Sequence, residues 1–251
     1  MRIIPVIDIR NGAVVRARAG DRTSYRPIAT PLATTSAPAD VVAGFLTLHP
    51  FEKIYVADLD AIEGSGDNRR AIGALTQRYP SLRFMVDAGA KSDDWRGVSG
   101  IERVIGSESS CDEESIRALN GDPNVILSLD FRGDEFLGPR PLIDRAELWP
   151  RRIIVMTLAR VGVGAGPDVE RLATIIERAG ERRVYAAGGV RDARDLARLE
   201  AIGAAGALVA TALHDGALNR ADLERANVMR QNTIRQDTMR QEKREPRKAP
   251  F

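Results

Sequence analysis

The chain has 251 residues, of which 43% are hydrophobic and 29% charged, and its formal net charge is only +2. This composition is typical of one globular domain with a large core, and so small a net charge argues against nucleic acid as the main partner. No apolar run reaches the roughly 18 residues that a membrane span needs, and the first residues lack a signal-peptide pattern, so we expect a cytoplasmic protein with no membrane partner. One cysteine excludes an internal disulfide, and with only two histidines we expect no metal centre.

Short apolar runs rich in β-branched residues alternate along the chain with segments of helical periodicity. The runs predict eight strands, over residues 2–8, 53–58, 82–88, 102–106, 124–130, 152–157, 183–188 and 206–211. The segments between them predict helices over 38–48, 67–79, 112–120, 167–180 and 191–203. This alternation predicts a parallel sheet, and eight such units predict a single α/β domain, a (βα)8 TIM barrel over residues 1–226. Active sites of that fold lie at the C-terminal ends of the strands.

An internal repeat relates the two halves of the chain. "VIDIRNG" around Asp8 matches "SLDFRGD" around Asp130, "VADLDAIEGSGD" matches "VMTLARVGVGAGPD", and "AGAKSDD" matches "AGGVRDARD". The three offsets are 122, 99 and 100 residues, so the connection after the first strand is longer than the one after the fifth. Duplication of a half-barrel explains the repeat most simply. The extra residues, "AVVRARAGDRTSYRP", predict a small hairpin over the barrel mouth.

The composition changes over residues 227–251, where arginines recur and few side chains could be buried. We interpret this segment as a basic C-terminal tail, either a helical extension or a solvated terminus. A nucleic-acid or partner-binding arm is the less favoured alternative, and we assign the tail no chemistry.

Two acidic residues close apolar strands at repeat-related positions. Asp8 ends the first strand and Asp130 the fifth, so both are expected at the rim of the barrel, on opposite sides. Two carboxyls in different surroundings can divide into a general acid and a general base. The alternative is that each acid caps the following turn or pairs with a neighbouring arginine, Arg10 or Arg132.

Glycine-rich turns offer two places where backbone N–H groups could hold a phosphate, because an anion can approach the backbone only past small residues. The stronger candidate combines Gly188 and Gly189 with Thr211 on the next strand, since strands seven and eight are the customary phosphate site of such barrels. A turn that needs positive φ would explain this glycine pair as well. The second candidate cup consists of Gly89, Lys91, Gly106 and Ser107.

Further polar residues follow the strands. Asp58 and Asp60 precede a glycine-rich loop and could hold sugar hydroxyls or a cation, although hydrogen bonding or a salt bridge is favoured over metal binding. Arg22 and Tyr25 in the first loop, and Arg160 after the sixth strand, could close on an anionic ligand. Exposed loop arginines are common, so neither Arg22 nor Arg160 is diagnostic alone.

The motifs "IIPVIDIRNGAVVR", "VADLDA", "VILSLDFR", "AAGGV" and "VATALHDG" occur in this order on five of the predicted strands. Together they resemble the HisA/HisF family of histidine-biosynthesis barrels over about residues 1–218. The likeness is greater to HisA, a cofactor-independent isomerase that converts an aminoaldose into an aminoketose on a substrate with two phosphates. The resemblance implies that Asp8 is the general base, that Asp130 is the general acid and that the two cups hold the two phosphates.

The chain departs from HisA at several motifs. Residues 87–91 read Asp-Ala-Gly-Ala-Lys where the family has Gly-Gly-Gly-Ile-Arg, and residues 157–162 read Thr-Leu-Ala-Arg-Val-Gly in place of Asp-Ile-Ser-Arg-Asp-Gly. Ala210 replaces a glycine, and the loop after strand five lacks a Gly-Trp pair. "GDRTSYRP", "ADLDAIEG" and "ARVG" resemble instead a HisA-related branch of methanogens and methylotrophic bacteria. That resemblance implies a changed substrate and a role in tetrahydromethanopterin or methanofuran metabolism.

Two functions from different classes therefore remain open. The first is an isomerase or related acid/base enzyme, without a cofactor, that acts on a phosphorylated sugar derivative; the two aspartates favour it. The second is a non-catalytic barrel that kept an anion site and serves as a phospholigand-binding or assembly protein; the altered motifs favour it. The sequence gives no oligomeric state.

Overall fold

The computed structural model describes residues 1–109, 117 and 121–226. Nearly all of the helix expected over 112–120, and the whole of the tail expected over 227–251, lie outside these residues. No helix in the described part of the chain is long and apolar enough to cross a membrane.

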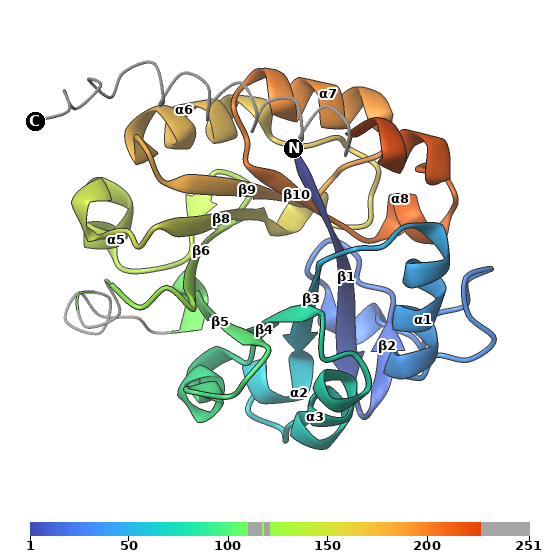
Figure 1. The fold of residues 1–251 in the computed structure, drawn as a ribbon. Coiled ribbons are helices and arrows are strands. Elements are labelled where there is room, and N and C mark those ends of the chain that lie inside the picture. Colours follow the sequence, from blue (N-terminus) through green and yellow to red (C-terminus); the bar gives the residue numbers. More distant parts are fainter. Residues whose placement is uncertain (110–116, 118–120, 227–251) are drawn as a thin grey trace, which may run out of the picture.

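Eight parallel strands close into a barrel (Figure 1). Each strand pairs with the next, and the last pairs with the first, where Arg2 lies opposite Gly206. Every strand begins and ends within two residues of a predicted run, which confirms the (βα)8 barrel. The strands are β1 (Arg2–Arg10), β3 (Lys53–Asp58), β4 (Arg83–Asp87), β5 (Ile101–Gly106), β6 (Val125–Arg132), β8 (Arg152–Thr157), β9 (Arg183–Ala187) and β10 (Gly206–Val209).

Two short antiparallel strands extend the barrel at repeat-related places. β2 (Ala13–Val15) pairs with β1, and β7 (Glu135–Phe136) pairs with β6. The expected hairpin after the first strand is therefore present. It continues into a loop that holds the 3-10 helix η1 (Arg22–Ser24).

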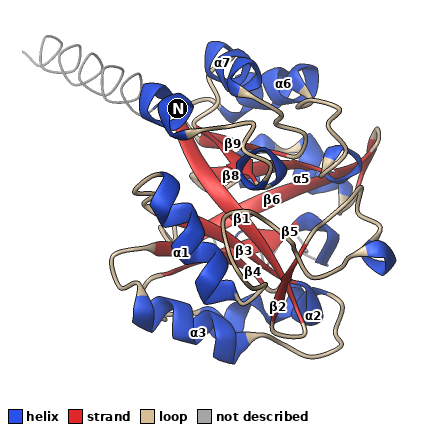
Figure 2. Cartoon of the chain, turned by 90° about the vertical axis from the view of Figure 1, so that its right-hand side faces the viewer, coloured by secondary structure: helices blue, strands red, loops and turns tan. Residues whose placement is uncertain are grey.

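Helices cover the outside of the barrel (Figure 2). The longer ones are α1 (Pro38–Leu48), α3 (Arg69–Arg78), α6 (Val169–Ala179) and α7 (Ala193–Ala201). Their starts follow local chemistry, since Asp168 and Asp192 accept hydrogen bonds from the first free N–H groups of α6 and α7. The shorter helices are α2 (Leu59–Ile62), α5 (Arg140–Asp144), α8 (Thr211–His214) and the 3-10 helices η2 (Gly89–Trp95), η3 (Ser107–Ser109), η4 (Ala146–Leu148) and η5 (Leu158–Arg160).

Alternation along the strands divides the core into two parts. Outward-facing residues such as Ile7, Phe84 and Leu127 pack under the helices, while inward-facing residues such as Ile4 and Tyr55 fill the barrel. The same period of two turns Asp8, Asp87 and Asp130 inward, at or near the C-terminal ends of β1, β4 and β6. The fold therefore brings three carboxyls to one end of the barrel.

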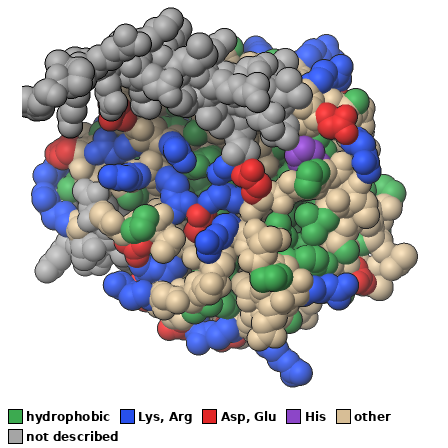
Figure 3. Space-filling model, viewed as in Figure 1, with side chains coloured by type: hydrophobic (Ala, Val, Ile, Leu, Met, Phe, Trp, Pro, Cys, Tyr) green, Lys and Arg blue, Asp and Glu red, His purple; other side chains and the backbone are tan. Residues whose placement is uncertain are grey.

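The other end of the barrel is closed by ion pairs. Glu102 lies between Lys53 and Arg152, whose guanidinium is 2.8 Å away, and Arg2 pairs with Glu52 over 2.9 Å. Figure 3 shows the face at which the strands begin, with Lys and Arg side chains gathered near its centre. Access to the barrel interior is consequently from the C-terminal ends of the strands.

Candidate active site

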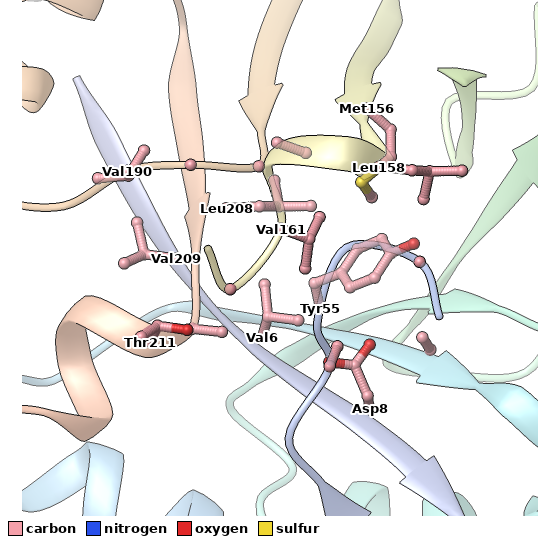
Figure 4. Close-up of a pocket in the computed structure, with 18 of the residues that line it drawn as sticks. Val6, Asp8, Tyr55, Met156, Leu158, Val161, Val190, Leu208, Val209 and Thr211 are labelled. Carbon is pink, nitrogen blue, oxygen red and sulfur yellow. The ribbon is translucent and has the colours of Figure 1, made fainter. Parts of the chain in front are cut away.

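A cavity of about 320 Å³ opens at the C-terminal ends of the strands. Apolar side chains of β1, β8 and β10 form one part of its wall (Figure 4). The three inward-facing aspartates also line it. Loops after β1, β8, β9 and β10 complete the rim. The residues used below that line it are Asp8, Arg22, Tyr55, Asp87, Glu108, Asp130, Arg132, Ala187, Gly188, Gly189 and Thr211.

Asp8 points into the cavity from β1 (Figure 4). Its carboxyl accepts no hydrogen bond from any residue that the structure describes. Burial raises the pKa of Asp8 to about 7, against the opposing charge of Arg22, and the nearby Asp87 raises it further. A carboxyl with free lone pairs and a pKa near neutrality can accept a proton from a bound molecule.

Asp130 reaches the cavity from β6, on the opposite side of the barrel, and is 5% exposed. Its Oδ1 accepts a hydrogen bond from the Ser128 hydroxyl over 2.6 Å, and its Oδ2 accepts from the Ser107 hydroxyl and the Glu108 amide, each over 3.3 Å. Burial raises the pKa of Asp130 to about 7; the Ser128 hydrogen bond opposes this rise, and the charges of Asp87 and Glu108 add to it. The carboxyl is therefore firmly oriented and can carry a proton at neutral pH.

The arginine pairing considered for the two aspartates is not found among the described residues. Arg10 pairs with Glu63 instead, and Arg132 lies on the cavity rim. Neither Asp8 nor Asp130 forms a salt bridge there, so both carboxyls face the cavity rather than a fixed cation.

Asp87 and Tyr55 belong to the site although the sequence analysis did not select them. Tyr55 donates its hydroxyl to Asp87 Oδ2 over 3.1 Å, and the Gly89 amide donates to Asp87 Oδ1 over 3.0 Å. Burial raises the pKa of Asp87 to about 6, against the effect of these two hydrogen bonds. The sequence did contain a signal for Asp87. The apolar run "RFMVD" ends in an acid, just as the apolar runs before Asp8 and Asp130 do.

Arg22 lies at the cavity rim, as expected for a residue that meets an anion. Its guanidinium donates to Glu108 over 2.8 Å and lies 3.8 Å from Glu63. Two carboxylates therefore share its charge already, and Glu108 is a further acidic residue of the rim that the sequence analysis missed.

The first predicted anion cup lies on the cavity wall. Gly188 and Gly189 have φ angles of 98° and 89°, and a Cβ on Gly189 would lie 2.2 Å from the Gly166 carbonyl oxygen. The turn therefore needs glycine both for its conformation and for its contacts. The amides of Gly189 and Thr211 donate to no acceptor in the described part of the chain. These N–H groups remain available to an oxyanion.

The second predicted cup does not line the cavity, which corrects the expectation for its four residues. Gly89 and Gly106 are buried, and the Gly89 amide is used by Asp87. Lys91 donates to the Gly66 carbonyl over 2.7 Å, and Ser107 donates to the Leu137 carbonyl over 2.7 Å as well as to Asp130. The protein's own carboxylates and carbonyls thus satisfy the donors that were expected to hold a phosphate.

Asp58 and Arg160 are likewise not on the cavity wall, which corrects their assignment as ligand-binding residues. Asp58 is 1% exposed and accepts hydrogen bonds from the Ala61 amide and from the amide and side chain of Asn68. Arg160 donates to the Gly166 carbonyl over 3.1 Å. Asp58 therefore stabilises the turn after β3, which agrees with the hydrogen-bonding alternative.

Within residues 1–109, 117 and 121–226, no three His, Cys, Asp or Glu side chains are arranged to hold a metal ion.

The chain is similar to known proteins along nearly its whole length. The sequence profile of the family described as "Histidine biosynthesis protein" matches residues 2–219. An uncharacterized protein of Methanocaldococcus jannaschii is 27% identical over 86% of this chain and 94% of its own length. Phosphoribosyl isomerase A of Streptomyces coelicolor is 29% identical over 85% and 93%, and a phosphoribosyl imidazole-4-carboxamide isomerase of Cutibacterium acnes is 30% identical over 86% and 88%. The chain belongs to the histidine biosynthesis protein family, the HisA/HisF barrels.

Proposed function

We propose that this protein is an acid/base isomerase that converts a phosphorylated aminoaldose into the corresponding aminoketose without a cofactor. The observation that carries the proposal is the placement of Asp8 and Asp130, which face one cavity from opposite sides with pKa values of about 7. A group whose pKa lies near the working pH can both donate and accept a proton, and each such group contributes roughly 10²–10⁴ in rate. The names of the relatives support the isomerase class.

The reaction needs one proton delivered and one removed. Asp130 would protonate the ring oxygen as the bond from that oxygen to C1 breaks, which leaves an iminium group at C1. Asp8 would then remove the proton from C2, and the electron pair of that C–H bond forms the C1–C2 double bond of an enolamine. Return of a proton to C1 and loss of the proton from the C2 hydroxyl give the ketone, so atoms and electrons balance.

The surroundings of the two carboxyls support this division of roles. The charge of Arg22 favours the ionised form of Asp8, which a base must have, and outweighs the opposing charge of Asp87. The charges of Asp87 and Glu108 favour the protonated form of Asp130, which an acid must have, against the hydrogen bonds from Ser128 and the Glu108 amide. The open amides of Gly189 and Thr211 would hold the substrate's phosphate at the other side of the cavity.

Histidine auxotrophs that lack the isomerase provide the first test. Growth on expression of this chain would identify the substrate as the histidine intermediate. We favour a different substrate, because residues 87–91 and 157–162 depart from the HisA motifs. Phosphorylated amino sugars and intermediates of tetrahydromethanopterin or methanofuran synthesis are therefore the next compounds to assay.

Single variants separate the enzyme from a binding protein. Asp8→Asn and Asp130→Asn keep the shape of the carboxyl but cannot transfer its proton, so each should lower turnover at least 10²-fold while ligand affinity changes little. Asp134→Asn is the matched control, because Asp134 is fully exposed and pairs with Arg171. Tight ligand binding without turnover in the wild-type protein would favour the second candidate, a phospholigand-binding barrel, which the altered motifs at residues 87–91 and 157–162 support.

A further inference from the structure

The two halves of the barrel carry equivalent glycine turns, one after β4 and one after β9. Gly89 and Gly189 are 100 residues apart, and the same offset relates Asp87 to Ala187. In the second half, Ala187 and Gly189 line the cavity, and the Gly189 amide has no acceptor among the described residues. In the first half, the Gly89 amide donates to Asp87 Oδ1 over 3.0 Å. In the first half, the Asp87 carboxylate therefore occupies the position next to the glycine amide. In the second half, the shorter side chain of Ala187 leaves the corresponding position empty.

Other donors near the first-half turn are occupied as well. The Glu108 amide donates to Asp130 Oδ2 over 3.3 Å, and Lys91 donates to the Gly66 carbonyl. The turn itself is closely packed, because a Cβ on Gly89 would lie 3.0 Å from the Cα of Ile62 in α2. At this turn the Gly89 and Glu108 amides are therefore already used, and α2 packs closely against Gly89.

The charges at this end of the cavity also oppose a second phosphate. Asp87 and Glu108 already raise the pKa of Asp130, which means that each added negative charge there is unfavourable. The charge of Arg22 acts on Asp8 and Asp87, and Glu108 already binds its guanidinium over 2.8 Å. Arg132 contributes a further positive charge, but it lies on the exposed rim.

The size of the cavity agrees with a small ligand. Its volume of about 320 Å³ lies at the lower end of the range of about 300–1,000 Å³ that ligand pockets span. A substrate with phosphates at both ends would need room beyond both turns, and only the turn after β9 provides it.

We propose that the Asp87 carboxylate acts as a built-in substitute for one phosphate, so that the substrate carries a single phosphate, held at Gly188 and Gly189. The end of the substrate that faces Asp87 and Tyr55 then carries a hydroxyl or amino group rather than an anion. This inference rests on the proposed function, because it takes the second-half turn as the phosphate site.

Titration with inorganic phosphate tests the inference, with the sites located in phosphate-soaked crystals. The wild-type protein should bind one phosphate, at Gly189. Asp87→Ala copies Ala187 and frees the Gly89 amide, so this variant should bind a second phosphate beside Gly89. Asp87→Asn removes the charge but leaves the side chain in the turn, so it should still bind one. Thermal unfolding of each variant shows that it is folded.

A bisphosphate probe gives a second readout. Fructose 1,6-bisphosphate should bind at least tenfold more tightly to Asp87→Ala than to the wild-type protein, whereas fructose 6-phosphate should bind both within about threefold. Two phosphates on the wild-type protein, or one on Asp87→Ala, would overturn the inference alone. No phosphate at Gly189 would overturn both this inference and the phosphate site of the proposed function. If the wild-type protein binds one phosphate at Gly189 but isomerises no substrate, the single-phosphate inference stands and the proposed isomerase function is wrong.

Discussion

Tyr55 donates its hydroxyl to Asp87 over 3.1 Å, and this bond links the interior of the barrel to the carboxyl that fills the first-half turn. Burial raises the pKa of Tyr55 well above its usual range, and the charges of Asp87 and Asp130 raise it further. The hydroxyl therefore remains protonated at neutral pH and acts as a donor. Because hydrogen bonding to a carboxylate favours its ionised form, Tyr55 keeps the pKa of Asp87 lower than burial alone would set it.

Replacement of Tyr55 by phenylalanine should therefore raise the pKa of Asp87 above its present value of about 6. The carboxyl would lose a donor while its burial stayed the same. Carbon-13 NMR of labelled aspartate carboxyls, followed over pH 4–9, measures the shift directly. An unchanged or lower pKa of Asp87 in Tyr55→Phe would mean that the hydroxyl does not stabilise the carboxylate.

Stability should depend on pH through Asp130. Its pKa rises from 3.8 in the unfolded chain to about 7 in the folded protein, so the folded state binds more protons between these values. The contribution of Asp130 to the free energy of unfolding is therefore fully present below about pH 3.8 and is lost as the pH rises through about 7. Asn at this position has no proton to lose, and Asp130→Asn should be more stable than the wild-type protein at pH 8, by an amount on the order of 1–4 kcal/mol.

Chemical denaturation at pH 5 and pH 8 measures this effect. At pH 5 the folded protein keeps the Asp130 proton while the unfolded chain has lost most of it, so the gain from Asp130→Asn should be smaller than at pH 8 and should vanish only below about pH 3.8. Asp134→Asn should change stability little at either pH, because its carboxyl is fully exposed. Equal destabilisation by Asp130→Asn at both pH values would show instead that the lost hydrogen-bond geometry outweighs the charge.

The sequence predicted the barrel because its signals are local and repeated. Alternating apolar runs specify strands without knowledge of the partners, and Asp8 and Asp130 stood out since each ends such a run at a repeat-related position. Asp87 was missed because it was read as part of a glycine turn. Whether the Gly89 amide faces a ligand or the preceding carboxylate depends on backbone torsion and on the Tyr55 hydroxyl from a neighbouring strand, which spacing alone does not specify.

Sequence spacing also failed to specify the role of Asp58, which was selected as a candidate site residue. Its position near the end of a strand resembles that of the three cavity acids. Asp58 lies one residue beyond the inward-facing position of β3, however, so the period of two turns its side chain away from the barrel interior. The inward-facing residue is Ala57, which lines the cavity. A single step in strand register thus decides between a site residue and a structural one.

Substitution of Gly189 tests the remaining anion cup. Gly189→Ala places a Cβ 2.2 Å from the Gly166 carbonyl oxygen at a φ of 89°, so the turn must move and phosphate affinity should fall at least tenfold. Gly64→Ala is the matched control, because Gly64 also has positive φ (70°) but a Cβ there meets nothing within 4 Å. Calorimetry of phosphate binding distinguishes the two. Equal affinity in both variants would argue against the turn as the phosphate site.

Removal of the Asp58 carboxyl should reduce stability without altering catalysis. Asp58→Ala leaves the buried Ala61 and Asn68 backbone amides without their acceptor, while the Asn68 side chain keeps its bond to Asp60 over 2.8 Å, and each unsatisfied buried donor costs about 1–3 kcal/mol. We expect a loss of at least about 2 kcal/mol in the free energy of unfolding, measured by denaturant titration. Because Asp58 does not line the cavity, kcat and KM of the folded fraction should stay within about threefold of the wild-type values. Asp58→Asn is the informative partner variant, since its carbonyl can replace only one carboxylate oxygen and should recover part of the stability. A large rise in KM at unchanged stability would instead return Asp58 to the substrate site.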